Sequence, residues 1–568
     1  MNNATSRLRR AAVLLLAINL LLANASAEHQ RTQKRDSSDQ PRLVLIIVVD
    51  QFRYDYVERF ADLFGSGGFR RLLNEGAFFV DANYEHLPTY TAVGHAAIFT
   101  GSVPALNGIV GNAYYDRKSR RIRIMVADDS ARLVTSAGAS SEAGAVSPRS
   151  LIGTTLGDQM RLATKFQSKV IAVSLKDRAA ILPGGQRPNG AYWFSEADGE
   201  FVSSDYYTRQ LPEWVRKFNA EKRPDKYFGK SWERLLPADA YARAQDTNLD
   251  IQTSALGPKF PHLIKGSATA PDAKFYDAFE ITPFASDYLA QFAEAAVQAE
   301  QLGADQYPDL LAISFSSPDL CGHYYGPDSQ EIVDTYARLD RTIGELLEFL
   351  DKKVGLANML IAVTGDHGVA PVPEYEQSVG VDAMRLSARD LQNAVSKSLS
   401  ARYGLENGVL AFVNGQLYLD QNQILEKKLD PAEVERSAGE AALSAPGVVS
   451  YFTRSQILSG AMPAGPISRR VTNGFNAERS GDVWVITRPF SFYPEAPLAT
   501  THGTPYNYDS HVPVIIVGKG IKAGKYFAPA SPADIAPTLA ALLGIEPPSN
   551  RYGRVLSESI VEKSVTRP

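Results

Sequence analysis

The chain has 568 residues, of which 44% are hydrophobic and 21% are charged, and this is the composition of an ordinary globular protein. Its formal net charge of −4 excludes the strongly basic balance of many nucleic-acid-binding proteins, so no nucleic-acid-binding patch is expected. Cys321 is the single cysteine of the sequence, which excludes intramolecular disulfides.

The N-terminus has the pattern of an exported protein. The pair Arg9-Arg10 precedes an apolar run at residues 11–22, and Ala25-Ser26-Ala27 is a cleavage pattern. We therefore predict a signal peptide over 1–27, a flexible mature N-terminus over 28–41 and a periplasmic or secreted protein. The apolar run is too short to span a bilayer comfortably, so no membrane anchor is expected after cleavage. An uncleaved anchor is the alternative, and the paired arginines leave twin-arginine export open.

Five short apolar runs rich in β-branched residues predict strands buried on both faces, as in a parallel sheet. They are VLIIVV (44–49), VIAVSL (170–175), LLAISF (310–315), MLIAVT (359–364) and VIIVG (514–518). Helical patterns lie between some of them: apolar residues recur with a 3.6-residue period after Ile332, and Ser531-Pro532 begins a helix that Gly544 ends. This alternation predicts an α/β fold, with a doubly wound, mostly parallel sheet and helices on both of its faces.

Two stretches lack this alternation. Residues at about 190–280 are rich in aromatic residues, Gly, Pro and Asp, with weak periodicity. Residues at about 385–490 contain a hairpin signal, Asn414-Gly415, and a later strand pattern at 483–487. We predict that both are cap insertions in a catalytic domain spanning 42–568.

Ligands of open α/β sheets bind at the carboxyl ends of the strands, so the residues beside the runs form the candidate site. If the five runs belong to one parallel sheet, most of these residues meet at one edge; they are Asp50, Lys176, Arg178, Asp319, His323, Asp366, His367 and His502. Asp319 and His323 are spaced i, i+4 and could share a metal if Pro318 begins a helical turn. Each residue alone is an ordinary cap or loop residue, but three carboxylates with three imidazoles suit zinc and could hold two ions.

Together with Thr91 in TAVGH (91–95), these residues resemble the alkaline phosphatase superfamily, and most closely its single-chain bacterial alkaline phosphatases with a threonine nucleophile. The match runs in linear order from about residue 42 to about residue 555. The resemblance implies an alkaline phosphatase-like fold with Thr91 as the nucleophile, and Thr89 as its neighbour. It also implies a phosphate site made by Asn112, Lys176 and Arg178. One zinc site is implied at Asp319, His323 and His502. A second zinc site is implied at Asp50, Asp366 and His367, and Thr91 would also contact this second zinc.

The function that this resemblance implies is that of an exported, zinc-dependent alkaline phosphatase. It would hydrolyse small phosphate monoesters through a phosphothreonine intermediate and release inorganic phosphate, and we expect a monomer. The alternative is a type I nucleotide pyrophosphatase/phosphodiesterase of the same superfamily, which shares the zinc ligands and the threonine but lacks the Lys-x-Arg pair seen here at Lys176 and Arg178.

Three other interpretations fit the residues less well. A sulfatase needs a C-x-P-x-R-type motif, whereas the cysteine here lies in CGHYY. A cofactor-independent phosphoglycerate mutase normally uses serine and is not exported. A phosphate- or metal-binding protein without activity would not need Thr91. The remaining histidines match no ligand position; they are His86, His95, His262 and His511. Of these, His95 is expected to pack locally. Cys321 should point away from the site if its turn is helical.

Overall fold

The computed structural model describes residues 40–143, 145–245, 254–265, 269–494 and 498–561. The predicted signal peptide and nearly all of the polar segment that follows it lie outside the described residues. Within the described ranges, no helix combines the length and the apolar character needed to cross a bilayer.

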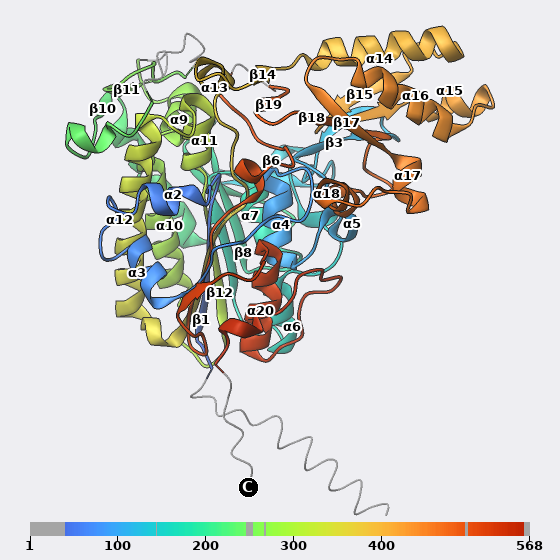
Figure 1. Cartoon of the computed structure of the whole chain (residues 1–568). Helices are drawn as coiled ribbons and strands as arrows, with labels where there is room; N and C mark the ends of the chain where they lie inside the picture. The colour runs from blue at the N-terminus through green and yellow to red at the C-terminus, as the bar shows by residue number, and fades with distance from the viewer. Residues whose placement is uncertain (1–39, 144, 246–253, 266–268, 495–497, 562–568) are drawn as a thin grey trace, which may run out of the picture.

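A mixed, mostly parallel sheet forms the centre of the molecule (Figure 1). In spatial order its 11 strands, counted over the described residues, are β21 (Gly524–Tyr526), β2 (Ala77–Phe79), β20 (Val514–Gly518), β13 (Met359–Gly365), β1 (Leu43–Val49), β12 (Asp309–Phe315), β7 (Val170–Ser174), β8 (Gly190–Ser195), β9 (Glu200–Ser204), β5 (Arg132–Thr135) and β6 (Gly138–Ala143). The strands from β13 through β8 are parallel. The predicted fold class is confirmed.

β20 departs from the expected parallel direction, because it pairs antiparallel with β13. An apolar run specifies burial on both faces but carries no information on strand direction. The antiparallel direction has a consequence for the site. The loop that enters β20 lies at the same edge of the sheet as the loops that leave the parallel strands, so His502 still reaches that edge.

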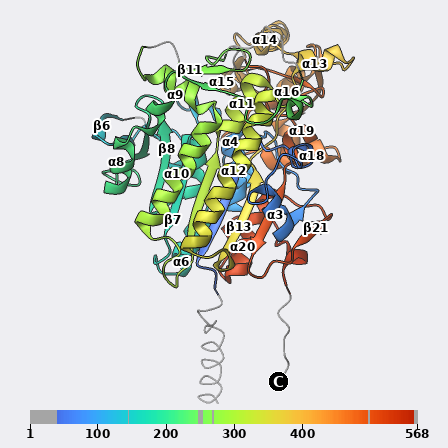
Figure 2. The ribbon, with the colours of Figure 1, turned by 90° about the vertical axis from the view of Figure 1, so that its left-hand side faces the viewer.

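Alternate residues of β1 point into two separate cores. Leu43, Leu45 and Ile47 pack in one cluster, and Val44 and Ile46 pack in the other. Helices on the first face include α2 (Asp55–Arg59), α3 (Phe69–Glu75), α10 (Pro283–Glu300), α11 (Ser317–Tyr325) and α12 (Gln330–Lys353), and Figure 2 shows α10, α11 and α12 across it. The opposite face is covered by α4 (Thr91–Thr100), α6 (Leu156–Ala163), α7 (Asp177–Gly184) and α20 (Ile535–Leu543). Burial of both faces explains why the strands are continuously apolar.

The caps of the predicted helices agree with their sequence signals. The side chain of Ser329 accepts a hydrogen bond from the Ile332 N–H and so caps the start of α12. Ser531 and Asp534 form a capping box over a 3-10 turn that leads into α20, and Gly544 follows its last residue.

The structure places two additional regions beside the sheet. The first region is a four-stranded sheet that holds the predicted hairpin, and Asn414 and Gly415 both have the positive φ of the two-residue hairpin turn. The strands of this sheet and the helices packed on it are β15 (Val409–Val413), β16 (Gln416–Leu419), β17 (Val448–Thr453), β18 (Val483–Thr487), α14 (Ala388–Tyr403) and α16 (Pro431–Leu443). The second region includes α8 (Glu213–Ala220), α9 (Ala273–Glu280), β10 (Lys230–Trp232) and β11 (His262–Ile264). β8 and β9 belong to the central sheet although they fall within the range expected for the first insertion.

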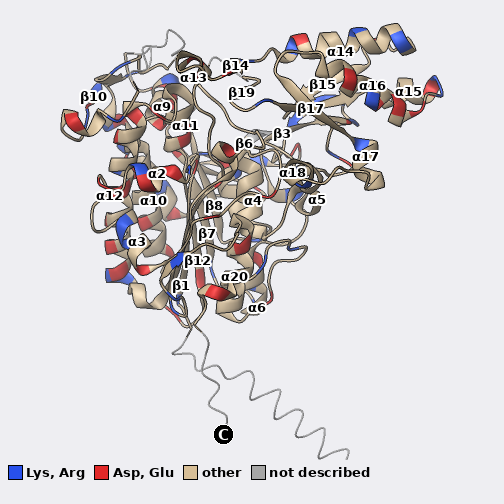
Figure 3. Cartoon of the chain, viewed as in Figure 1, with Lys and Arg blue, Asp and Glu red and all other residues tan. Residues whose placement is uncertain are grey.

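Acidic and basic residues both occur on the described helices, as Figure 3 shows for α12 and for the helices of the four-stranded region. This mixed distribution agrees with the small net charge of −4. Any positive potential at the candidate site must therefore come from local groups.

Candidate active site

The predicted metal ligands form two groups at the carboxyl edge of the parallel strands. The first group is Asp319, His323 and His502, and the second group is Asp50, Asp366 and His367. In each group the potential ligand atoms all lie within 4.8 Å of one another.

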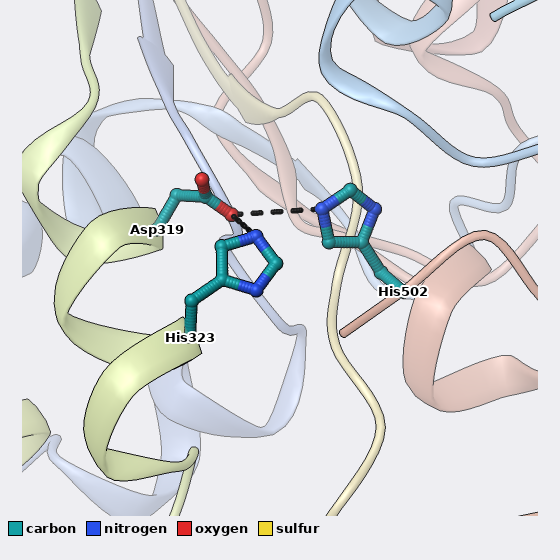
Figure 4. A group of neighbouring side chains, drawn as sticks. All are labelled: Asp319, His323 and His502. Carbon is teal, nitrogen blue, oxygen red and sulfur yellow. Dashed lines mark ion pairs between the residues drawn. The ribbon is translucent and has the colours of Figure 1, made fainter. Parts of the chain in front are cut away.

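The fold brings each ligand to this edge in a different way. Asp50 directly follows β1 and Asp366 directly follows β13, and these two strands pair in full register. Asp319 and His323 lie one turn apart on α11, which begins shortly after β12, with Pro318 in its first turn. His502 lies in the loop before β20. Figure 4 shows Asp319 and His323 projecting from α11 toward His502.

The three histidines present the same ring nitrogen to the two groups. A backbone carbonyl accepts a hydrogen bond from Nδ1 of each ring: Thr500 O from His323 (2.9 Å), Gly368 O from His367 (2.9 Å) and Thr89 O from His502 (2.7 Å). A carbonyl only accepts, so a proton is assigned to Nδ1 of each ring, and Nε2 is the nitrogen that is left to face the carboxylates. Nε2 of His323 lies 3.2 Å from Asp319 Oδ1, and that of His502 lies 3.7 Å from it. Histidine ligands of metals are commonly oriented in this way.

The carboxylates of the second group contain buried oxygens that fit a cation. Asp50 Oδ1 and Asp366 Oδ2 are buried and have no hydrogen-bond donor among the described residues. Nε2 of His367 lies 3.4 Å from the first oxygen and 3.5 Å from the second. Buried acceptors without donors are costly unless a ligand satisfies them, and the mixed N and O donors of both groups suit zinc.

The two groups are neighbours. The rings of His367 and His502 stack with centroids 3.6 Å apart and an interplanar angle of 19°. Nζ of Lys176 donates to Asp50 Oδ2 at 2.7 Å and also donates to Asp319, so one ammonium contacts an aspartate of each group. The arrangement can therefore place two cations side by side.

Burial and charge set the protonation of these groups. Burial raises the pKa of Asp50, and the neighbouring Asp319 and Asp366 raise it further. Burial alone would also raise the pKa of Asp319, but His323 and Lys176 outweigh it and hold that pKa well below its usual range. Burial lowers the pKa values of His367 and His502, which keeps their imidazoles neutral. Neutral imidazole is the form that binds a metal.

Thr91 is the first residue of α4, and its Oγ1 lies 3.5 Å from Nε2 of His367. The backbone N–H of Ala92 donates to Oδ1 of Asn112 (2.9 Å). This bond holds the side-chain amide of Asn112 beside Thr91 and does not use the Nδ2 donors of Asn112. Nε of Arg178 is buried without a hydrogen-bond partner among the described residues. Nη1 of Arg178 lies 3.6 Å from Asp177 Oδ1, which makes a long ion pair. The site thus has unused donors as well as a hydroxyl.

The motif TAVGH has two further structural uses. A Cβ at Gly94 would lie 2.1 Å from the backbone oxygen of Asp366, so only glycine lets α4 approach the second group this closely. Nδ1 of His95 lies 2.8 Å from the carbonyl of Thr91 and 3.3 Å from Asp366 Oδ2, and Nε2 lies 2.8 Å from Ser314 Oγ. His95 packs against its own helix, as predicted, and it also contacts Asp366, a candidate ligand, which was not predicted. The sequence signal for the contact of His95 with its own helix was its i, i+4 spacing from Thr91.

Asp509 supports the loop that carries His502. Its Oδ2 accepts hydrogen bonds from the N–H and the hydroxyl of Thr504, both at 2.6 Å. Nothing in the sequence distinguished this aspartate from other loop residues. The residues that were not expected to be ligands lie outside both metal groups: His86, His262, His511 and Cys321. Cys321 is buried, with its Sγ 3.5 Å from the Thr335 hydroxyl.

The chain is similar to known proteins in sequence and in overall structure. Residues 44–505 match the family model described as type I phosphodiesterase / nucleotide pyrophosphatase. The chain is 38% identical over 559 residues to the alkaline phosphatase PhoV of Synechococcus elongatus, covering 96% of this chain and 99% of that relative. It is 37% identical over 535 residues to the alkaline phosphatase PafA of Elizabethkingia meningoseptica, covering 93% and 96% of the two chains. A crystal structure of wild-type PafA superimposes with a TM-score of 0.84, covering 92% of this chain and 99% of that one.

Proposed function

Since the chain belongs to the type I phosphodiesterase / nucleotide pyrophosphatase family of the alkaline phosphatase superfamily, we propose that it is an exported, zinc-dependent alkaline phosphatase that acts on phosphate monoesters. The observation that carries the proposal is the position of the Thr91 hydroxyl, 3.5 Å from His367 and beside two groups of potential metal ligands. The near full-length similarity to two alkaline phosphatases supports the same conclusion.

In the proposed reaction, Thr91 first loses its hydroxyl proton to solvent water. Oγ1 then forms a bond to phosphorus while the bond from phosphorus to the leaving-group oxygen breaks, and that oxygen takes up a proton from water. Water then attacks the phosphothreonine, which releases inorganic phosphate and restores the threonine hydroxyl. Thr91 is in place at the N-terminus of α4, where backbone N–H groups favour an anion.

Two zinc ions, one bound by each group, would lower the pKa of the Thr91 hydroxyl and stabilise charge on the leaving-group oxygen. The non-bridging oxygens of the phosphoryl group would be held by Asn112, Lys176 and Arg178. Arg178 can bind phosphate with two parallel N–H groups, whereas Lys176 acts as a point charge. These contacts contribute most where they strengthen in the transition state.

Charge favours a monoester over a diester. Three carboxylates, two cationic side chains and two divalent ions leave an excess of three positive charges, which the Thr91 alkoxide reduces to two. A dianionic monoester balances that excess. A diester carries one negative charge, and its second ester group would crowd the donors of Asn112, Lys176 and Arg178. We therefore propose that hydrolysis of diesters is a minor activity.

The nucleotide pyrophosphatase/phosphodiesterase alternative is favoured by the name of the matching family model. The ratio of kcat/KM for p-nitrophenyl phosphate and bis-p-nitrophenyl phosphate distinguishes the two functions in the zinc-loaded enzyme. We expect the monoester to be strongly preferred. A preference for the diester would contradict the proposal and establish the alternative.

Export is proposed from the pattern of residues 1–27. N-terminal sequencing of the protein recovered from the periplasm or medium should begin at Glu28. A chain that begins at residue 1 and remains with the membranes would contradict this assignment. We further propose that the mature enzyme is a monomer, which its sedimentation mass would test.

A further inference from the structure

We propose that Gln51 is a positioning residue that ties the two metal groups together. The proposal rests on the proposed function, since it takes both groups to hold zinc. Gln51 directly follows the ligand Asp50 and is 1% exposed. Its backbone N–H donates to Asp366 Oδ1 (3.1 Å), and its side-chain Nε2 donates to Asp319 Oδ1 (2.7 Å) and to the Asp319 carbonyl (3.3 Å). One residue therefore contacts an aspartate of each group, in addition to Lys176.

The backbone of Gln51 makes this double contact possible. Its φ is 67°, in the left-handed region that residues with a Cβ rarely adopt. The phenol of Tyr336 donates to its carbonyl at 3.4 Å. Strained backbone of this kind persists only where the surroundings fix it, and such residues cluster at functional sites. Here the turn lets the N–H and the side chain of one residue serve two different carboxylates.

Gly322 on α11 makes room for the amide. A Cβ at Gly322 would lie 1.8 Å from Oε1 of Gln51, and all three of the nearest atoms belong to Gln51. Oε1 is itself buried with no donor among the described residues. A side chain placed only to fill space would not leave a buried acceptor unpaired. The amide is therefore best explained by what its NH₂ group does, which is to orient Asp319.

The carboxylate oxygen that Gln51 contacts is the one that faces the histidines. Asp319 Oδ1 lies 3.2 Å from Nε2 of His323, whereas the other oxygen of Asp319 accepts from Lys176. On Asp366 the oxygen that Gln51 contacts is Oδ1, which leaves Oδ2 for the metal site. Hydrogen bonds to ligands typically change metal affinity by about 10- to 100-fold.

The two contacts of Gln51 can be separated by mutation. Any replacement of the side chain except proline keeps the backbone N–H, and therefore the contact with Asp366. Gln51→Met removes only the contact with Asp319, so it should weaken zinc binding in the first group by about 10- to 100-fold and leave the second group unchanged. Gly322→Ala should weaken the same group, because the added methyl displaces the amide.

The test is a zinc titration of the metal-free full chain against a chromogenic chelator, with zinc content measured per chain. We expect Gln51→Met and Gly322→Ala each to lower the affinity for one of the two zinc ions, and added zinc to restore turnover. Because both changes act on one amide, Gly322→Ala should have little further effect in a Gln51→Ala background. Cys321→Ala is the matched control, since it changes a buried residue of the same helix and should leave both affinities unchanged.

The inference would be overturned if Gln51→Met and Gly322→Ala lowered the affinity for both zinc ions equally, or for neither. Additive effects in the double variant Gln51→Ala/Gly322→Ala would also overturn it. Should Gln51→Met fail to fold, Gly322→Ala decides alone, because glycine has no side chain and the change removes no side-chain contact. A wild-type protein that binds no zinc would contradict the proposed function and the inference together. Two ions in the wild type with unchanged affinities in the variants would contradict the inference alone.

Discussion

Lys176 should stabilise the metal-free protein through the two carboxylates that it contacts. Its side chain is 10% exposed, and those of Asp50 and Asp319 are 0% and 2% exposed. Although burial would lower the pKa of Lys176, these carboxylates raise it above its usual value. Removing one partner of a buried ion pair costs about 3–5 kcal/mol, because the other charge is left without compensation. Lys176→Met keeps the apolar stem and should cost about that much.

Arg178→Met is the matched control. The side chain of Arg178 is 26% exposed and its ion pair with Asp177 is long, at 3.6 Å. An ion pair of this kind contributes at most about 1 kcal/mol. The assay is urea denaturation of both variants after exhaustive chelation and again with saturating zinc. The loss in Lys176→Met should be large without metal and much smaller with zinc, since the ions then supply the compensating charge. Equal losses in the two variants without metal would refute this reasoning.

Thr91→Ala should abolish turnover while phosphate still binds, and Thr91→Ser should retain part of the activity; near wild-type turnover in Thr91→Ala would contradict its role. Chelation should lower both activity and melting temperature, with zinc restoring activity better than magnesium; full activity in metal-free protein would contradict the two metal sites. Cys321→Ser should leave turnover and bound zinc nearly unchanged, as metal analysis can check. Burial raises the pKa of Asp509 to about 7, so the folded state holds an extra proton between about pH 4 and pH 7 and loses stability as the pH rises through that window. Asp509→Asn should lose less stability than wild type from about pH 4 to about pH 7; parallel losses in urea denaturation would contradict the assignment.

Five strands of the central sheet were predictable because they form continuous apolar runs that are buried on both faces. β1, β7, β12, β13 and β20 each coincide with an apolar run. Their directions were not predictable in the same way, because burial is the same for parallel and antiparallel neighbours. Six further strands of the sheet were not predicted: β2, β5, β6, β8, β9 and β21. In β8 and β9 the aromatic and polar residues resemble those of the region that follows.

The meeting of the candidate ligand residues was predictable because parallel strands end at one edge, so residues far apart in sequence could be expected to meet. The residues that contact these candidate ligands were not predictable. Gln51 contacts Asp366 across 315 positions of the chain, and His502 contacts the carbonyl of Thr89 across 413 positions. Such contacts depend on how loops pack after the strands have assembled. Local spacing gives no signal for them.

The most direct test of the proposed mechanism is to locate the phosphoryl group on the enzyme during turnover. Zinc-loaded protein is mixed with p-nitrophenyl phosphate, quenched in acid within the first turnover, digested and mapped by mass spectrometry. The account predicts one phosphoryl group on Thr91, and none when Thr91→Ala is treated in the same way. Phosphate on Thr89 or on another residue, or phosphomonoester turnover without any covalent intermediate in a single-turnover time course, would contradict it.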